Sequence, residues 1–206
     1  MGSNPTNGLN FLYSPLSIMN KASFLESQQS LFIHALKQPS SREKAFKSLV
    51  AEYKERLYWH IRKIVLDHDD AHDVVQNTFI KVYLNIATFK ENSSLYTWMY
   101  RIATNEALNF IKSKSTKMGL QNQQWVEAVA DSLVADSYFD GDEAALLLQK
   151  IVARLPEKQR LVFNMKYFDG MNYESISEIL DTSVGALKAS YHHAVKKIKS
   201  QLNDEE

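Results

Sequence analysis

The sequence contains no cysteine among its 206 residues. This absence excludes disulfide bonds and thiolate metal sites, and it is compatible with a reducing compartment. No apolar run approaches the roughly 20 residues that a membrane-spanning helix requires, and the N-terminus lacks the basic, apolar and small-residue succession of a secretory signal. The sequence therefore predicts a cytoplasmic location.

An excess of charge of either sign is also missing, because Lys plus Arg and Asp plus Glu both number 24. Proteins that bind phosphates usually have an excess of cations, so this balance at first argues against nucleic acid as a partner. The charges are, however, segregated along the chain. Residues 119–149 contain acids but no Lys or Arg, whereas residues 184–202 contain lysines but no acid. The segregation predicts an acidic segment followed by a basic helix.

Hydrophobic periodicity predicts an all-α protein with two small helical domains joined by an acidic flexible linker. Residues 1–30 are rich in Asn, Ser, Gln and Pro and are expected to be disordered. The first domain is expected over residues 31–117 and the second over residues 143–206. Residues 118–142 are expected to form the linker, in which periodicity is weak and there is room for one helical turn.

Three helices are expected in the first part of residues 31–117. The first is Leu31–Lys37, and the second is Arg42–Val65 with Ser40 or Ser41 as its N-cap. The third has Asp70 as its N-cap and Asp73 in its first turn, and this helix ends near Thr88. Apolar residues recur at spacings of three and four in the second and third of these segments, so both helices are expected to pack in a core.

The stretch Ser94–Lys117 is expected to form the last helix of this domain. At about 100° per residue one arc of that helix contains an indole, two amides and two cations: Trp98, Arg101, Asn105, Asn109 and Lys112. Rings stack on bases, amides read base edges and cations bind the phosphate backbone, so this arc is typical of a surface for single-stranded nucleic acid. An ordinary amphipathic helix with a half-buried Trp98 is the alternative.

The second domain contains the most specific pattern of the chain. A helix is expected over Glu143–Arg154, and another over Glu157–Phe168 with Leu161, Val162, Met165 and Phe168 facing inward. Asn172 then caps a short helix, Tyr173–Leu180, a three-residue turn follows, and Val184–Leu202 forms a longer helix. A short helix, a tight turn and a longer basic helix predict a helix-turn-helix, whose second helix enters the DNA major groove. Its outward side chains are Lys188, Ser190, His192, His193 and Lys196.

Three segments in this order resemble the bacterial RNA polymerase sigma factors of the extracytoplasmic-function (ECF) group, in the sigma-70 superfamily. They are DAHDVVQNTFIKVYLNIATF at residues 70–89, SSLYTWMYRIATNEALNFIKSK at residues 93–114 and LPEKQRLVFNMKYFDGMNYESISEILDTSVGALKASYHHAVKKIK at residues 155–199. The resemblance implies a factor that binds core RNA polymerase and directs promoter recognition, promoter melting and transcription initiation. It implies that residues 31–117 are sigma region 2 and residues 143–206 sigma region 4.

The resemblance also implies roles for individual residues. The single strand of the minus-ten element would contact Phe89, Trp98, Arg101 and Asn105, with Asn109 and Lys112 continuing that face. The polymerase would contact a segment of the third helix that includes Asp73, Val74, Val75, Gln76, Phe79 and Lys81. An anti-sigma factor is the implied regulator, and no cofactor, metal or catalytic residue is expected.

The recognition helix departs from the pattern of the family. This chain has Ser190, His193 and Val195 where the family often has Arg. Because Arg supplies both a phosphate contact and a bidentate contact to guanine, we expect modest affinity for free DNA, with specificity expressed mainly inside the polymerase complex.

Two other functions fit parts of the sequence. The cluster His68, Asp69, Asp70, His72 and Asp73 is superficially similar to metal-dependent phosphohydrolases with His-Asp pairs, although the same acids suit the start of a helix. A helix-turn-helix regulator with a ligand-sensing N-terminal domain is the other alternative, and binding to core polymerase distinguishes it from a sigma factor.

Overall fold

The computed structural model describes residues 29–131 and 143–203. Within these two segments the chain forms helices and no strand, which confirms the predicted all-α class. The predictions for residues 1–28 and for the linker residues 132–142 lie outside the described residues. Contacts divide the chain into two compact units, residues 1–48 and 49–206. None of the described helices combines the length and apolar character needed to cross a membrane.

The first unit contains a helix over residues 29–37 and the start of α2 (Pro39–Val65). The predicted start of α2 at Arg42 is wrong, because Pro39, which fits the first turn of a helix, already begins it. Ser41 is no N-cap, since its hydroxyl donates to the carbonyl of Ala35 at 2.8 Å. The Arg42 side chain donates to the carbonyls of Leu36 and Lys37 at 3.1 and 3.0 Å, and it thereby satisfies the C-terminal end of the preceding helix.

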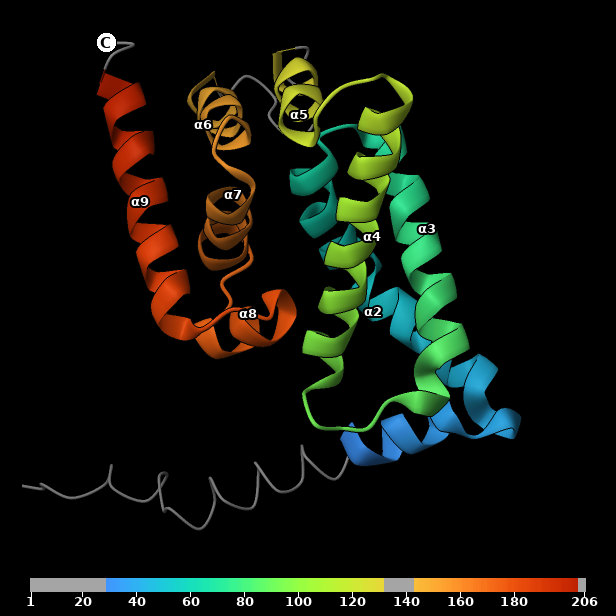
Figure 1. Ribbon diagram of the computed structural model, residues 1–206. Helices are drawn as coiled ribbons and strands as arrows, with labels where there is room; N and C mark the ends of the chain where they lie inside the picture. Colours follow the sequence, from blue (N-terminus) through green and yellow to red (C-terminus); the bar gives the residue numbers. More distant parts are fainter. Residues whose placement is uncertain (1–28, 132–142, 204–206) are drawn as a thin grey trace, which may run out of the picture. The chain divides into compact units, whose positions relative to one another are not determined.

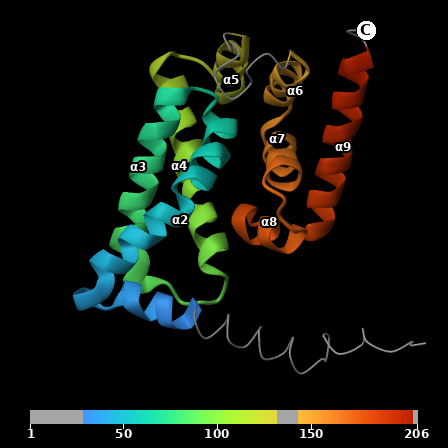
Figure 2. The ribbon, with the colours of Figure 1, turned by 180° about the vertical axis from the view of Figure 1, so that it is seen from behind.

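The first helical group of the second unit, residues 49–131, contains the rest of α2, then α3 (His68–Asn85), the 3-10 turn η1 (Ile86–Thr88), α4 (Leu95–Lys117) and α5 (Asn122–Asp131). Helices α3 and α4 pack side by side (Figures 1 and 2). Apolar side chains from three helices are fully buried, among them Leu57, Ile61, Val82 and Met99. Their burial is the main stabilising contribution to this group.

Helix α3 begins two residues before its predicted cap. Asp67, in an extended conformation, is the N-cap and accepts from the Asp70 amide at 2.9 Å. Asp69 and Asp70 therefore occupy the first turn, where the helix dipole favours acids. The pattern of acids placed the helix start within three residues but did not decide which Asp caps it.

Helix α5 is longer than the sequence predicted for this part of the linker. It has 10 residues and contacts α4. Trp125 and Val126 are buried, and the Ser115 hydroxyl donates to Asn122 Oδ1 at 2.7 Å. Three buried apolar residues, Trp125, Val126 and Ala130, and one polar anchor were too few to produce a clear periodic signal.

The second helical group, residues 143–203, contains α6 (Glu143–Ala153), α7 (Glu157–Phe163), the π-helix η2 (Asn164–Phe168), α8 (Tyr173–Leu180) and α9 (Val184–Asn203). Its core joins α6, α7 and α9 through Ile151, Phe163, Ala194 and Ile198. Leu161, Val162 and Met165 are buried as predicted, but Phe168 is 38% exposed. The π-helix explains this difference, because its wider turn shifts the side chains that follow away from the α-helical register.

Candidate nucleic-acid interface

Helix α4 ends at Lys117, as the sequence predicted, and begins at Leu95, one residue after the predicted start. Ser94 is its N-cap and accepts from the Thr97 amide at 3.0 Å. Met99, Ala103 and Ala107 are fully buried along its inner side. One side of α4 is thus fixed in the core, which gives the opposite side a defined orientation.

The outer side of α4 contains the predicted strand-binding residues. Arg101, Asn105, Asn109 and Lys112 are exposed and Trp98 is half-buried. Within the described part of the chain, the side chains of these four exposed residues form no hydrogen bond or ion pair. Their donors and acceptors are therefore available to a ligand, and the α4 face, as we call these five residues, combines stacking, amide and cationic chemistry.

Phe89 lies beneath this face rather than on it. It is 4% exposed, and its ring centroid lies 5.0 Å from that of Trp98 at an interplanar angle of 37°. In this conformation Phe89 is too buried to contact a base directly. The sequence reasoning grouped the two aromatics but could not assign the inner and outer position.

The predicted polymerase-binding residues of α3 divide into two sets. Val74, Val75 and Phe79 are buried, at 1, 4 and 8% exposure, whereas Asp73, Gln76 and Lys81 are exposed. Two large apolar side chains, Ile80 and Leu84, are also exposed, at 50 and 70%. The outward surface of α3 therefore mixes apolar and polar groups, while the three buried residues attach the helix to the core.

The helix-turn-helix has the predicted local geometry. Asn172 caps α8 by accepting from the Ser175 amide at 2.7 Å. Asp181 ends α8 in the left-handed region with φ of 48°, which turns the chain sharply toward α9. Leu187, Ala194 and Ile198 bury one side of α9.

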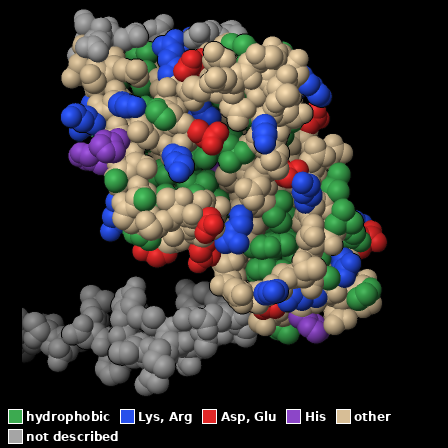
Figure 3. All heavy atoms as spheres, viewed as in Figure 1, with side chains coloured by type: hydrophobic (Ala, Val, Ile, Leu, Met, Phe, Trp, Pro, Cys, Tyr) green, Lys and Arg blue, Asp and Glu red, His purple; other side chains and the backbone are tan. Residues whose placement is uncertain are grey.

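The opposite side of α9 is basic. Lys188, His192, His193 and Lys196 are exposed, and Ser190 is partly buried. Lys188 Nζ lies 5.7 Å from the ring centroid of Tyr173 on α8, and the rings of His192 and His193 are 6.0 Å apart. Figure 3 shows histidine and basic side chains together along the α9 edge of the molecule. This side of α9 carries cations and imidazoles without interruption by acids, a charge pattern that suits phosphates.

The His-Asp cluster at the start of α3 has other partners. Asp70 forms an ion pair with Lys114 at 3.0 Å, and His68 Nδ1 is 2.7 Å from the Tyr58 hydroxyl. The His72 ring also contacts Tyr58, with centroids 4.8 Å apart. Among the described residues, no group of three or more His, Asp or Glu side chains has the geometry of a metal site. The contacts assign these residues to helix capping and packing.

The sequence reasoning missed one polar cluster. His60, from α2, is fully buried; its Nδ1 lies 2.6 Å from Asp169 Oδ2, and its Nε2 lies 2.9 Å from the Thr104 hydroxyl. Lys63 Nζ lies 2.8 Å from Asp169 Oδ1. We call His60, Lys63 and Asp169 the ion cluster. The signal for it was a histidine on the apolar stripe of α2, between Leu57 and Ile64.

The ion cluster shifts the titration of its acid. Burial by itself would raise the pKa of Asp169, but the charges and hydrogen bonds of His60 and then Lys63 lower that pKa below the ordinary value of 3.8. Asp169 is therefore ionised at neutral pH. Burial also raises the pKa of the neighbouring Tyr100, so its phenol stays neutral.

Two solved structures have the same fold. One, titled "Structure of CnrH in complex with the cytosolic domain of CnrY", has a TM-score of 0.65 and 18% identity, over 86% of this chain and 99% of that chain. The other, the sigma factor RpoE in complex with the anti-sigma factor NepR from Bartonella quintana, has a TM-score of 0.62 and 20% identity, over 78% of this chain and 98% of that chain. At these identities the likeness establishes the fold.

The sequence comparisons identify the family. Sigma-70 region 2 matches residues 49–116 and Sigma-70, region 4 matches residues 145–198. The ECF RNA polymerase sigma factor SigW of Bacillus subtilis (strain 168) is 30% identical over 168 residues, which cover 78% of this chain and 90% of that protein. The RNA polymerase sigma-H factor of Pseudomonas aeruginosa is 28% identical over 168 residues, which cover 78% of this chain and 87% of that protein. The chain therefore belongs to the ECF group of RNA polymerase sigma factors.

Proposed function

We propose that this chain binds core RNA polymerase and directs it to promoters, where the two helical domains recognise and open the DNA. The first domain, over residues 31–117, binds the minus-ten element as a single strand, and the second, over residues 143–206, reads the minus-thirty-five element as duplex. The main support is the presence, in one chain, of the α4 face and a basic helix-turn-helix, in the order that the family models match.

The α4 face is suited to a base that has left the duplex. Removing a base from the stack costs a few kcal/mol, which stacking on an aromatic wall and hydrogen bonds to amides can offset. Trp98 offers that wall, because Phe89 supports its ring from below. Asn105 and Asn109 offer amides, while Arg101 and Lys112 offer contacts to phosphates. In this account Phe89 acts by positioning Trp98 and has no direct contact with DNA.

Helix α9 is the proposed reader of duplex DNA. Lys188 and Lys196 would contact phosphates, and His192 and His193 would face base edges or the backbone. Ser190, which is partly buried, lies between Lys188 and His192 in the sequence. Without Arg at these positions the helix has fewer phosphate contacts and no bidentate guanine contact. We therefore infer that sequence-specific binding requires the polymerase complex.

The exposed side of α3 is the proposed polymerase contact. Asp73, Gln76 and Lys81 are exposed there, beside the apolar side chains of Ile80 and Leu84. An exposed surface that mixes apolar and polar groups is typical of a protein interface. Val74, Val75 and Phe79 support this surface from within.

Regulation by an anti-sigma factor follows from the same proposal. RpoE of Bartonella quintana, which has this fold, was solved with the anti-sigma factor NepR. We infer a comparable protein partner for this chain, a cytoplasmic site of action, and a role in binding without catalysis by the chain itself.

In vitro transcription tests the proposal. Core polymerase, the purified protein and genomic templates should yield discrete transcripts, whose start sites can be mapped. Core polymerase alone and the Trp98→Ala, Asn105→Ala double variant are the controls, and both should give no specific transcripts. A regulator with a ligand-sensing domain would instead fail to bind core polymerase.

A further inference from the structure

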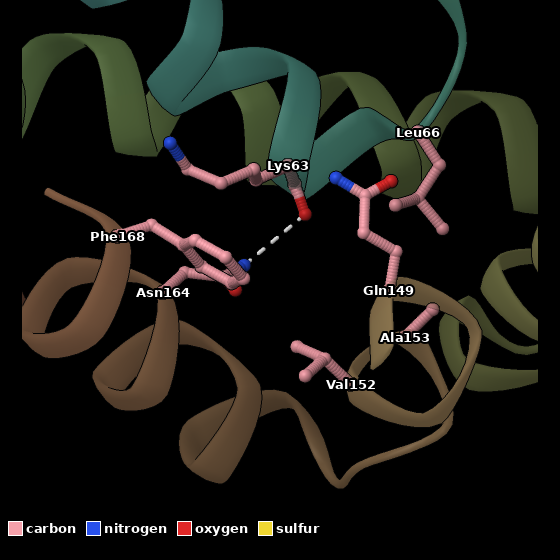
Figure 4. A pocket seen from close by; sticks show the side chains of 7 residues that line it. All are labelled: Lys63, Leu66, Gln149, Val152, Ala153, Asn164 and Phe168. Atoms are coloured by element: carbon pink, nitrogen blue, oxygen red, sulfur yellow. Dashed lines mark hydrogen bonds between the residues drawn. The ribbon is translucent and has the colours of Figure 1, made fainter. Parts of the chain in front are cut away.

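The two helical groups contact each other through buried polar atoms. His60 of α2 bonds to Asp169 after η2, and Lys63 of α2 bonds to the same carboxylate. Nearby, the Asn164 side chain of η2 donates to the Lys63 carbonyl at 3.2 Å, as Figure 4 shows. Asp169, which lies between η2 and α8, therefore ties the second helical group to the C-terminal part of α2.

The hydrogen bonds determine the protonation state of His60. The Thr104 hydroxyl donates its single proton to the Tyr100 carbonyl at 2.7 Å, so Thr104 accepts from His60 Nε2. The Asp169 carboxylate can only accept, so Nδ1 of His60 must donate to it. Both ring nitrogens then bear protons, and His60 is an imidazolium.

Among the described residues, Asp169 is the carboxylate that contacts the His60 ring. Helix α2 contributes the cations Lys63 and Arg56, and α4 contributes the neutral phenols of Tyr96 and Tyr100. The His60 and Tyr100 rings have centroids 4.8 Å apart. An open cleft of about 540 Å³ borders Lys63 and Asp169, so solvent reaches the edge of the ion cluster. Separating the groups would leave a buried imidazolium without its counter-ion.

The closed arrangement is incompatible with binding both promoter elements, an argument that rests on the proposed function. Elements named for positions ten and thirty-five lie about 25 base pairs apart, or roughly 85 Å at about 3.4 Å per base pair. Two domains of this size in direct contact have centres roughly 30 Å apart.

We propose that the ion cluster is a charge-dependent lock: with His60 protonated it holds the free protein closed, and Asp169 must leave His60 and Lys63 before both promoter elements are bound. Protonation of Asp169 as the pH falls through its lowered pKa removes the negative charge of the cluster and opens the protein. The closed form is therefore most populated above that pKa.

Distance measurement between spin labels tests the lock directly. Because the chain has no cysteine, Glu55→Cys on α2 and Ser200→Cys on α9, both at exposed positions, allow selective labelling. The wild-type background should give mainly one short distance near neutral pH. His60→Gln and Asp169→Asn should each raise the long-distance population at least about tenfold, because each leaves a buried partner uncompensated. His34→Gln, which removes an exposed histidine outside the cluster, should leave the distances unchanged.

A second measurement covers the possibility that His60→Gln does not fold. The ¹⁵N chemical shifts of His60 in the unaltered protein should report two protonated ring nitrogens at neutral pH, where the closed form predominates. A neutral His60 in the closed protein, or a folded Asp169→Asn variant that stays closed, would overturn the proposal. Because both readouts use the protein alone, an absence of transcription with a working lock would instead overturn the proposed function.

Discussion

The ring of Phe89 lies directly against the indole of Trp98, with centroids 5.0 Å apart, and Phe89 is buried while Trp98 is half-buried. The two aromatics thus differ in role although they are near neighbours in the sequence. One belongs to the core and the other to the surface that the core supports. This relationship gives the first two predictions.

Trp98→Ala should impair promoter opening far more than promoter binding. Stacking of a base on an aromatic side chain is worth about 1–3 kcal/mol, so opening should fall roughly 10- to 100-fold. Permanganate reactivity of unpaired thymines at the start site measures promoter opening. Asn92→Ala, in an exposed loop away from the α4 face, is the control and should open promoters normally. If the Trp98→Ala variant opens promoters as well as the wild type does, the α4 face does not bind the opened strand.

Phe89→Leu should weaken opening without removing any DNA contact. The smaller side chain keeps most of the buried volume, so we expect the free energy of unfolding to fall by about 1 kcal/mol. The indole of Trp98 loses its supporting ring, and the NMR signal of its indole N–H, which is distinct from those of Trp59 and Trp125, should report a more mobile environment. A variant that opens promoters at the normal rate, with an unchanged Trp98 signal, would show that Phe89 only fills the core.

Two substitutions on α3 separate the proposed polymerase surface from the core behind it. Ile80→Ser should weaken binding to core polymerase with little effect on stability, because Ile80 is 50% exposed. Val74→Ala should lower the free energy of unfolding by about 2 kcal/mol, because Val74 is 1% exposed. Chemical denaturation and a polymerase binding titration together distinguish these outcomes. Normal polymerase affinity of the Ile80 variant would place the interface elsewhere.

The recognition helix predicts a gain of function. His193→Arg should raise affinity for free duplex DNA, because Arg adds a phosphate contact or a bidentate guanine contact worth about 1–3 kcal/mol. Lys196→Ala should lower affinity and reduce the slope of log affinity against log salt by about 1. Lys54→Ala, on the exposed side of α2, is the matched control. Salt titrations in which all three variants coincide with wild type would exclude α9 as the duplex contact.

The lowered pKa of Asp169 predicts that the fold loses stability in acid. Because its pKa is lowered in the folded protein, the carboxylate stabilises the fold above its ordinary pKa of 3.8, and this contribution is lost as the pH falls through the lowered value. The difference in unfolding free energy between wild type and Asp169→Asn should therefore be constant at neutral pH and shrink in strong acid. A difference that stays constant across the acid range would show that the carboxylate is not preferentially ionised in the fold.

The sequence predicted those elements whose signals were local. The end of α4 at Lys117 and the Asn172 cap of α8 follow from residues within one turn of each other. Burial was harder to predict, because the exposed fraction of a side chain depends on which neighbouring helix covers it. Phe89, Val74 and Phe168 are examples. The family pattern grouped Phe89 with the DNA contacts, although the structure places it beneath them.

Interactions between residues far apart in the sequence could not be predicted from it. His60 and Asp169 are 109 residues apart, and nothing in the periodicity of either segment links them. The π-helix that precedes Asp169 adds a shift of register that an α-helical pattern does not predict. The chemistry of the α4 face could be inferred from residue types alone, whereas the ion cluster required the tertiary structure.

The most direct test of the central claim is start-site mapping after in vitro transcription with core polymerase and this protein on genomic templates. We expect a small set of defined start sites, each with a common pair of upstream elements, and none with core polymerase alone. If core polymerase neither binds the protein nor initiates at new sites in its presence, the assignment of two cooperating promoter-binding domains is contradicted.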